Sequence, residues 1–597
     1  MSRIQLAAIG LSLVALLLAS TASAAPTWLA PQDISGPGGN ADVPQIAVDA
    51  AGDAFAVWQR WNGPNLIIET AARPAGTVWQ PVQFLSAQGA DAHDPQIAVD
   101  PAGDAVAVWY RSNGLYYVIQ AAVRRAGSVW TAPQDLSAGG ANAYFPQVAI
   151  DQAGNALAVW YGFTGAGWIV QAAEHPVSGA WSAPQDLSAP GRDAEFPQVA
   201  FDRFGNALAV WHRFNGANLI VQAAARPAGG VWSAPQDLSV PGQDAENAQV
   251  AFDPAGNAVA VWERFDGTSW MIQAAARPAG GAWGAPQDLS AAGSTFGEDA
   301  LEPEVAMDAA GDALAIWTRY DGANGIIQAA ERPAGGGGAW SGAQDLSAPG
   351  RTAVEPQIAI DPAGNAVAVW RRYADVARQQ AIVQAARRPA GGAWEAPQDL
   401  SPVEQEAFGP QVAVDAAGNV VATWTRFVPG MNAIVQAAAL DAAGPVFDNL
   451  SVPARRSAGS RLAFSVHSFD VWSALAGSPH WTFGDRGSAD GWRVHHTYAR
   501  AGSYTVTLSQ SDAVGNQSTI SRTVSIAPAC VVPNVVGKTL AKAKAAIQRR
   551  HCRTGRVTRA FSRKVRRGRV LAQRPKAGNR LSNGARVNLV VSRGSRR

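Results

Sequence analysis

The chain has 597 residues, with 48 Lys and Arg against 46 Asp and Glu and a net charge near +2. This length is far beyond that of one ordinary domain. After the first 24 residues no stretch approaches the roughly 20 apolar residues that a membrane span needs, so no transmembrane segment is expected.

The first 24 residues have the pattern of a secretory signal peptide. Arg3 supplies a positive charge, residues 4–18 are mostly apolar, and Ala22-Ser23-Ala24 is a small-residue cleavage site. The apolar stretch is too short for an anchor, and no cysteine follows the cleavage site as in a lipoprotein. We therefore expect a secreted, extracellular protein.

Residues 25–443 contain one motif written eight times, each copy ending in tryptophan. A fixed spacing of this size is the signature of a repeat architecture, in which one unit cannot bury its own apolar face. The closing tryptophans recur every 51 to 55 residues, at Trp58, Trp109, Trp160, Trp211, Trp262, Trp317, Trp370 and Trp424.

Each repeat is expected to form four short strands. In the third copy these are Pro146–Asp151, Ala156–Trp160, Ile169–Ala173 and Trp181–Ser188. Alternating apolar residues and β-branched side chains favour strands, and Gly154-Asn155 is typical of a tight hairpin turn. Four strands in about 51 residues predict one blade of a β-propeller.

The order of the strands predicts how the ring closes. The fourth strand occurs first at Trp28–Ser35, before any other strand, and none follows the last three-strand set at Pro410–Ala439. The N-terminal strand would complete the final blade of an eight-bladed propeller and leave no free sheet edge. An open solenoid is the alternative. Sixteen of the 22 tryptophans occupy two repeat positions, where we expect them to pack between blades.

Residues 444–528 form a second β-rich segment. Trp481-Thr482-Phe483-Gly484-Asp485, His496-Thr497-Tyr498, the strand 501–508 and Asp512–Asn516 together resemble a PKD domain. That resemblance implies an immunoglobulin-like β-sandwich of the kind used as an extracellular spacer or binding module. The family usually has Asp in place of Thr482 and Gly in place of Arg486, so an altered turn is expected.

Residues 529–597 resemble a PASTA domain. The matching features are the run Val532–Gly537, a short helix expected at Thr539–Arg550, and the strand Val587–Ser592. The resemblance implies a small α+β module and a bacterial, wall-facing protein whose partner is peptidoglycan. The fold expected for the whole chain is therefore mostly β.

The terminal segment is strongly basic. It contains 20 of the 48 Lys and Arg and no Asp or Glu, so the residues before it hold 28 basic and 46 acidic side chains. This predicts attraction to peptidoglycan or an anionic wall polymer, and export argues against nucleic acid. A generic solvated basic surface is the alternative. The residues expected to act are Lys542, Lys544, Arg549, Arg550, Arg563, Lys564, Arg566 and Arg567.

The only two cysteines, Cys530 and Cys552, lie in this segment. In an oxidising compartment we expect them to form a disulfide that closes a loop of about 20 residues and stabilises the module by roughly 3 kcal/mol. The alternative is a metal pair with His551, which is less favoured because adjacent residues rarely point at one ion.

A ligand on the propeller, either a glycan or a protein, is expected on the face that carries the second-to-third-strand and blade-to-blade loops. These loops absorb most of the length changes between repeats, and binding sites are usually built on variable loops. An Arg–aromatic pair follows the tryptophan in six blades. It could bind sugar, or link blades through a cation–π contact or the fourth-strand aspartates. The pairs are Arg60-Trp61, Arg213-Phe214, Arg264-Phe265, Arg319-Tyr320, Arg372-Tyr373 and Arg426-Phe427.

No catalytic motif is recognised. The hairpin Asp-box of sialidases fails at Asp49–Gly52, where two residues instead of one separate Asp from Gly. The histidines have no metal-ligand spacing, so no catalytic residue, metal or cofactor is assigned, and a non-enzymatic, monomeric protein is expected. The expected function is envelope-associated binding or adhesion. The alternatives are a carbohydrate-active enzyme of the sialidase or glycoside hydrolase type, and a purely structural surface repeat.

Overall fold

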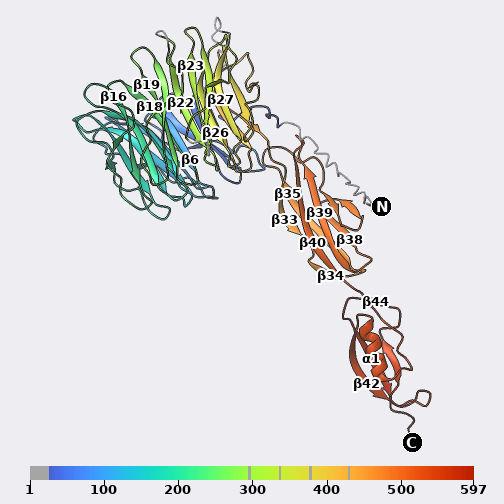
Figure 1. Ribbon diagram of the computed structural model, residues 1–597. Helices are drawn as coiled ribbons and strands as arrows, with labels where there is room; N and C mark the ends of the chain where they lie inside the picture. The colour runs from blue at the N-terminus through green and yellow to red at the C-terminus, as the bar shows by residue number, and fades with distance from the viewer. Residues whose placement is uncertain (1–25, 294–296, 335–337, 376–379, 428–429, 597) are drawn as a thin grey trace, which may run out of the picture.

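The computed structural model describes residues 26–596 except 294–296, 335–337, 376–379 and 428–429. The expected signal peptide and parts of three loops that vary in length between repeats lie outside the described residues. The chain forms a broad repeat module, a narrower sandwich and a small terminal module, arranged one after another (Figure 1).

Eight four-stranded antiparallel sheets make up the repeat module. The innermost strands are β2 (Ala41–Val48), β6 (Ala92–Val99), β10 (Ala143–Ile150), β14 (Ala194–Phe201), β18 (Ala245–Phe252), β22 (Ala300–Met307), β26 (Ala353–Ile360) and β30 (Glu406–Val414). The second strands are β3 (Ala54–Trp61), β7 (Ala105–Ser112), β11 (Ala156–Phe163), β15 (Ala207–Phe214), β19 (Ala258–Phe265), β23 (Ala313–Tyr320), β27 (Ala366–Asp375) and β31 (Val420–Phe427).

The third strands are β4 (Leu66–Arg73), β8 (Tyr117–Arg124), β12 (Trp168–His175), β16 (Leu219–Arg226), β20 (Trp270–Arg277), β24 (Gly325–Arg332), β28 (Gln380–Arg388) and β32 (Ile434–Leu440). The outer strands are β5 (Gln83–Phe84), β9 (Gln134–Asp135), β13 (Gln185–Asp186), β17 (Gln236–Asp237), β21 (Gln287–Asp288), β25 (Gln344–Asp345), β29 (Gln398–Asp399) and β1 (Gln32–Asp33).

The N-terminal strand closes the ring, as predicted. β1 pairs antiparallel with β32, and the Ile34 amide donates to the Val435 carbonyl at 2.9 Å. The innermost strands β2 and β30 also contact each other. The structure is therefore a closed eight-bladed propeller, and the open solenoid is ruled out.

The outer strands are shorter than the sequence predicts. The pattern predicted Trp181–Ser188 as one strand, but only Gln185–Asp186 pairs with β12. The flanking residues make single backbone bonds, with Ser182 donating to the Glu174 carbonyl and Leu187 to the Val170 carbonyl, but they do not extend the ladder.

The repeated tryptophans pack within and between blades, as expected. All eight on the second strands are fully buried, and those at the start of the outer segment are half-buried. The Trp109 indole donates to Gln120 at 3.1 Å, and the Gln120 amide donates to Asp135 at 2.8 Å. The same chain of bonds joins three strands in the blades of Trp160, Trp370 and Trp424.

The second module is a two-sheet β-sandwich, which confirms the immunoglobulin-like expectation. Its core packs Phe464, Trp481 and Tyr498. Arg486 stands where the PKD pattern has Gly and adopts φ 73°, so the turn keeps its left-handed geometry with a side chain. One sheet contains β33 (Val446–Ser451), β35 (Arg461–Phe469) and β38 (Arg493–Thr497), and the other contains β34 (Arg455–Ser457), β40 (Gln517–Ala527), β39 (Gly502–Ser511), β36 (His480–Thr482) and β37 (Ser488–Asp490).

The sandwich docks onto the propeller beside its closing blade. Arg73, at the end of β4, donates to the Val471 carbonyl at 2.8 Å and lies 3.8 Å above the Trp472 ring. From the sandwich, the Asn516 amide donates to the Asp441 carbonyl at 3.1 Å, directly after β32. The two modules therefore share polar contacts as well as the chain connection.

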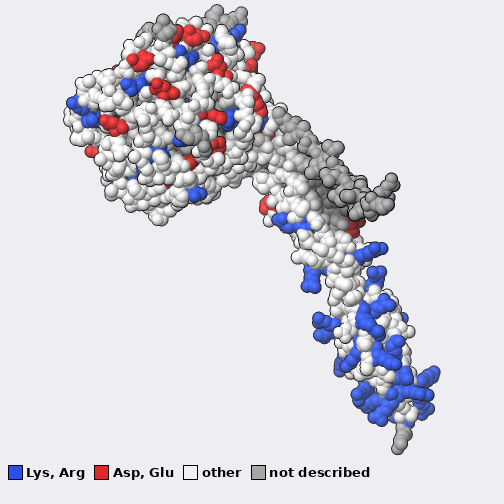
Figure 2. All heavy atoms as spheres, viewed as in Figure 1, with Lys and Arg blue, Asp and Glu red and all other residues white. Residues whose placement is uncertain are grey.

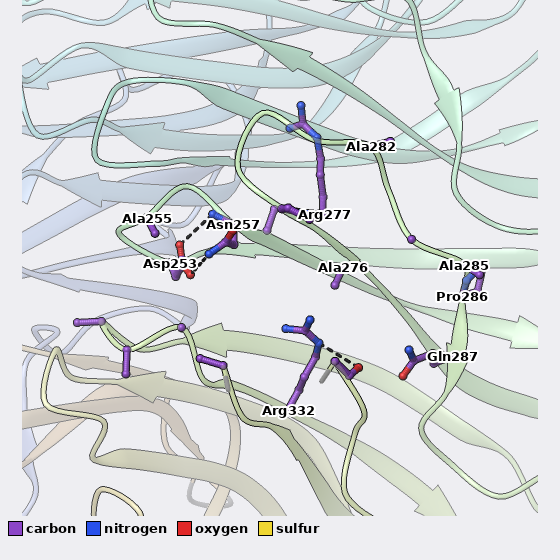
Figure 3. Close-up of a pocket in the computed structure, with 18 residues that line it drawn as sticks. Asp253, Ala255, Asn257, Ala276, Arg277, Ala282, Ala285, Pro286, Gln287 and Arg332 are labelled. Atoms are coloured by element: carbon purple, nitrogen blue, oxygen red, sulfur yellow. Dashed lines mark hydrogen bonds between the residues drawn. The ribbon is translucent and has the colours of Figure 1, made fainter. Parts of the chain in front are cut away.

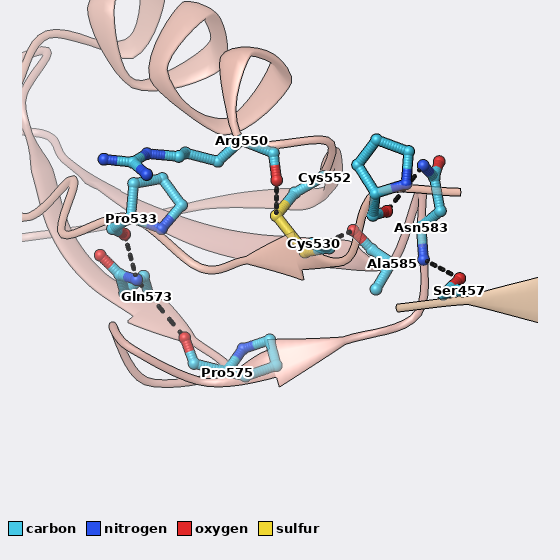
Figure 4. The surroundings of a disulfide bond; sticks show 10 residues. Ser457, Cys530, Pro533, Arg550, Cys552, Gln573, Pro575, Asn583 and Ala585 are labelled. Carbon is cyan, nitrogen blue, oxygen red and sulfur yellow. Dashed lines mark hydrogen bonds between the residues drawn. A yellow bond between two sulfur atoms is a disulfide. The ribbon is translucent and has the colours of Figure 1, made fainter. Parts of the chain in front are cut away.

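The terminal module is α+β, as expected. Its one described helix, α1 (Leu540–Arg549), buries Ala543 and Ile547. Cys530 and Cys552 form the predicted disulfide, and Asn583 donates to Ser457 and Pro528 of the sandwich side (Figure 4). Its strands are β41 (Cys530–Val531), β42 (Arg553–Ala560), β43 (Val570–Arg574), β44 (Arg580–Leu581) and β45 (Arg586–Ser592).

In the described part of the chain, α1 is far too short to cross a membrane, and no membrane-spanning helix is found.

Candidate functional site

The Arg–aromatic pairs lie at the ends of the second strands in six of the eight blades. Arg60 is buried and donates to the Pro37 carbonyl at 2.6 Å, and Arg264 donates to Gln243 at 2.9 Å. Arg426 lies 3.2 Å from Asp33, and Arg319 donates to the Tyr320 carbonyl. These four guanidinium groups are held by backbone and side chains of their own surroundings.

The remaining members of this set are also spread around the ring. Among the described residues, the Nε atoms of Arg213 and Arg372 have no hydrogen-bond partner. Trp61 and Phe214 are exposed, whereas Phe265, Tyr320, Tyr373 and Phe427 are half-buried. The pairs do not converge on one point, and the cation over Tyr373 is the neighbouring Arg371.

A large cavity lies on the opposite face from the one expected to bind ligand. It measures about 610 Å³ between the fifth and sixth blades, where Asp253, Asn257, Arg277 and Arg332 line it (Figure 3). Asp253 accepts hydrogen bonds from the Asn257 amide groups.

This cavity is one copy of a groove that the blade geometry repeats. The same repeat positions, Asp151 with Asn155 and Asp361 with Asn365, line smaller cavities between other blades. Because the same residues recur in each of these grooves, no groove is distinguished from the others as a functional site. The candidate site is therefore sought where the blades differ.

The blades differ around the axis, at a set of positions that we call the inner rim. Each innermost strand has a bulge there, and the bulged residue has φ between 46° and 60°. Left-handed geometry is unfavourable for β-branched and bulky residues, and such strain concentrates at functional sites. The inner rim consists of Val43, Asp94, Phe145, Phe196, Asn247, Glu302, Glu355 and Gly409.

One side of the inner rim is aromatic. Phe145 lies 5.1 Å from Phe196 and 5.8 Å from Tyr161 between ring centroids, and Phe196 lies 5.4 Å from His212. Phe145 and Phe196 are 38% and 41% exposed, so this aromatic surface faces solvent. The aromatic arc, from the second to the fourth blade, comprises His93, Tyr110, Tyr117, Tyr144, Phe145, Tyr161, Trp168, Phe196 and His212.

The other side carries carboxylates linked from blade to blade. Glu263 accepts the Glu302 amide at 2.7 Å, Glu302 accepts the Glu355 amide at 2.9 Å, and Glu355 accepts the Gly409 amide at 2.8 Å. Arg371 bridges Glu355 at 3.1 Å and a further carboxylate of the eighth blade at 3.3 Å. These bonds hold the strained rim residues in place.

Burial alters the acidity of this carboxylate side. It raises the pKa of Glu263 to about 7, and it raises that of Glu304, which lies deeper along the axis, to about 8. Burial also raises the pKa of Tyr161 and Tyr320. Carboxyl groups that hold a proton near neutral pH donate hydrogen bonds to hydroxyls or act as general acids.

The basic residues of the terminal module form a second, separate surface. All eight predicted side chains are exposed, and no ion pair joins any Lys or Arg of described residues 529–596 to an acid. Figure 2 shows Lys and Arg covering this module, whereas both charge signs mix on the propeller.

Sequence reasoning missed the inner rim. Its members are separated by a whole repeat and are of six different residue types, so no motif connects them. One signal in the sequence could have indicated these positions. The residue before the first-strand proline changes from blade to blade, as at Phe145-Pro146 and Glu302-Pro303, whereas the rest of the repeat is nearly constant.

Family models match two parts of the chain. The PKD domain matches residues 442–527 and the PASTA domain residues 531–593, which confirms both resemblances. Domains of these families are typical of extracellular or cell-envelope proteins. No curated protein matches the chain.

Solved structures match parts of the chain at low identity and low TM-score. An ulvan lyase of polysaccharide lyase family PL25 is 11% identical with a TM-score of 0.40, and the match covers 56% of this chain and 90% of the lyase. An α-L-arabinanase from Penicillium chrysogenum is 11% identical with a TM-score of 0.34, covering 70% and 98%. The PKD1 domain of Vibrio anguillarum Epp is 29% identical with a TM-score of 0.13, covering 14% and 95%.

These structures correct one expectation. The sequence predicted a protein that is not an enzyme, but the structural neighbours of the propeller include a polysaccharide lyase and glycoside hydrolases. The prediction that the protein is not an enzyme is therefore wrong.

Proposed function

We propose that the chain is an envelope-associated binding protein whose terminal module attaches to anionic wall polymers and whose propeller presents the inner rim to a carbohydrate. The observation that carries this proposal is the separation of the two surfaces. The terminal 69 residues hold 20 positive and no negative charges, and the aromatic arc lies on a different module.

The wall contact is electrostatic. Exposed Lys and Arg without intramolecular partners create a positive potential that attracts polyanions, and salt screens it over about 10 Å at 0.1 M. Replacing all eight predicted basic residues by glutamine leaves the buried core of Ala543, Ile547 and the disulfide unchanged.

We expect this eightfold glutamine variant to lose retention on isolated bacterial cell walls by at least about tenfold at 0.1 M salt, since eight of the module's 20 positive charges are gone. Sedimentation with walls at 0.05 to 0.5 M NaCl measures it. A control variant changes the same number of exposed Ser or Gln residues on the propeller. Unchanged retention, or retention insensitive to salt, would contradict the wall assignment.

The carbohydrate contact uses exposed aromatic faces. Sugars present apolar ring faces that stack on aromatic side chains, and an exposed apolar patch on a monomer marks an interaction site. The carboxylate side of the rim supplies hydrogen-bond partners for hydroxyl groups opposite this surface.

We expect Phe145→Ala with Phe196→Ala to weaken binding of the best ligand from a glycan array by about 2 kcal/mol, or roughly 30-fold. Phe214→Ala is the matched control, because it removes an exposed aromatic of the Arg–aromatic set outside the arc. If the double variant costs nothing, or if Phe214→Ala costs as much as the double variant, the rim assignment fails.

A second candidate, a carbohydrate-active enzyme, is favoured by Glu263, a carboxyl with a pKa of about 7 beside the inner rim. Product release from the array ligand during incubation would identify this function. Saturable binding without turnover would support the binding function.

A further inference from the structure

Three buried aspartates meet where the propeller joins the sandwich. Asp441 follows β32 of the closing blade, Asp470 follows β35 and Asp512 follows β39. Their side chains are at most 4% exposed, and one carboxylate oxygen of each lies within 4.8 Å of the other two. The cluster therefore draws one member from the propeller end and two from the sandwich.

Two of the aspartates also hold their own turns. Asp470 Oδ1 accepts the amides of Trp472 and Ser473 at 3.0 and 2.9 Å. Asp512 Oδ1 accepts three amides at 2.7 to 3.0 Å, and its Oδ2 accepts the Asn516 side chain at 2.9 Å. These turns fix the two carboxylates in position before any ligand arrives.

Asp441 differs from its neighbours. It is fully buried, and among the residues that the structure describes neither of its carboxylate oxygens has a hydrogen-bond partner. An unpaired carboxylate inside a protein is costly, and here two further carboxylates adjoin it. The Ser473 hydroxyl lies nearby, but it donates to Asp470 Oδ1 at 3.3 Å and to a backbone carbonyl.

The nearest cation does not neutralise the cluster directly. The Arg73 guanidinium donates to the carbonyls of Val471 and Trp472 and stacks on the Trp472 ring. No ion pair joins Arg73 to any of the three aspartates in the described part of the chain. Arg73 therefore acts on Asp441 and Asp470 only at longer range, and three carboxylates stand against this one guanidinium.

We propose that Asp441, Asp470 and Asp512 bind one Ca²⁺ ion, which locks the propeller to the sandwich. Ca²⁺ takes 6 to 8 oxygens at about 2.3–2.6 Å, so oxygens on opposite sides of one ion lie about 5 Å apart, in line with the 4.8 Å limit of the cluster. Waters complete the shell. Mg²⁺ fits less well because it demands a regular octahedron and dehydrates reluctantly.

The proposal gives Asp441 a specific function. Because its backbone carbonyl accepts the Asn516 amide while its side chain faces the ion, the end of the propeller would be tied to the sandwich twice. Without the ion, repulsion between the carboxylates would push this joint apart. The ion would thus determine the stiffness of the propeller–sandwich joint.

The test uses the full chain stripped with EGTA. Isothermal titration with CaCl₂ should show one equivalent bound, and Ca²⁺ should raise Tm and slow hydrogen exchange at the Trp472 and Ser473 amides. Asp441→Asn should weaken Ca²⁺ binding at least tenfold and show neither response. Asp361→Asn, which alters an equally buried aspartate whose oxygens are all used in its own turn, should bind Ca²⁺ as the unmodified chain does.

Each outcome decides the matter. No binding by the unmodified chain at 1 mM free Ca²⁺, taken as about the upper end of extracellular affinities, overturns the proposal. Full binding in Asp441→Asn overturns it as well, because the ion would then lie elsewhere. If Asp441→Asn fails to fold, Asp470→Asn replaces it. Tight Ca²⁺ binding retained in Asp470→Asn would also contradict the proposed site.

Discussion

Replacing Ile34 by aspartate is expected to lower the free energy of unfolding of the propeller by about 3–5 kcal/mol, because it places an unpaired charge in the closing contact. Ile34 is 6% exposed and packs with Trp58 of the first blade and Val435 of the last. Its backbone amide also donates to Val435, and the Ser35 hydroxyl accepts the Val435 amide at 2.9 Å.

The control for this experiment is Gln32→Asp, which adds the same charge to an exposed position of β1, two residues before Ile34. Denaturant unfolding measures the stability, and hydrogen exchange at the Val435 amide reports whether the closing strand has detached. A change of less than 1 kcal/mol in Ile34→Asp, with slow exchange at Val435, would mean that closure contributes little to the propeller.

Replacing Glu304 by glutamine is expected to stabilise the protein by about 2–4 kcal/mol at pH 9 and not at pH 4. Seven of the eight innermost strands have Gln at this position, and only the sixth blade has Glu. Burial raises the pKa of Glu304 to about 8, and the amides of Gln249 and Gln357 donate to its Oε1 at 3.3 and 3.1 Å.

The sign follows from proton binding. A folded-state pKa of about 8 against an ordinary 4.5 means that the folded protein binds more protons than the unfolded chain between these values. Stability therefore falls as pH rises from about 4.5 to 8, and glutamine removes this loss while its carbonyl still accepts both amide bonds. Gln198→Glu, at the same position of the fourth blade, should add a second fall in stability with rising pH, in the same direction as that of Glu304. Equal stability of Glu304→Gln and the unmodified chain at pH 9 would contradict the account.

The repeat architecture was accessible to sequence analysis because its evidence lies along the chain. The spacing of tryptophans such as Trp160 and Trp211 gave the blades, and the isolated first strand gave the closure. The helix was predicted at Thr539–Arg550 and observed at Leu540–Arg549, since its apolar spacing is local. Strand lengths were less predictable, because the residue pattern covers Trp181–Ser188 and does not indicate that the ladder is limited to Gln185–Asp186.

The sites were less accessible because they depend on contacts between distant repeats and modules. Phe145 and Phe196 meet only when neighbouring blades pack, and their left-handed geometry arises from a bulge that no local propensity indicates. Asp441, Asp470 and Asp512 come from strand ends in two modules, so only docking unites them. A histidine or aspartate spacing search along the chain has no means of finding such a cluster.

The most direct test of the proposed function compares two variants in two assays. The account predicts that Phe145→Ala with Phe196→Ala loses glycan binding and keeps full retention on cell walls, whereas the eightfold glutamine variant of the terminal module keeps glycan binding and loses retention. The account is contradicted if the Phe145→Ala, Phe196→Ala variant loses wall retention, or if the eightfold glutamine variant keeps it. Glycan binding and wall attachment would then not belong to separate surfaces.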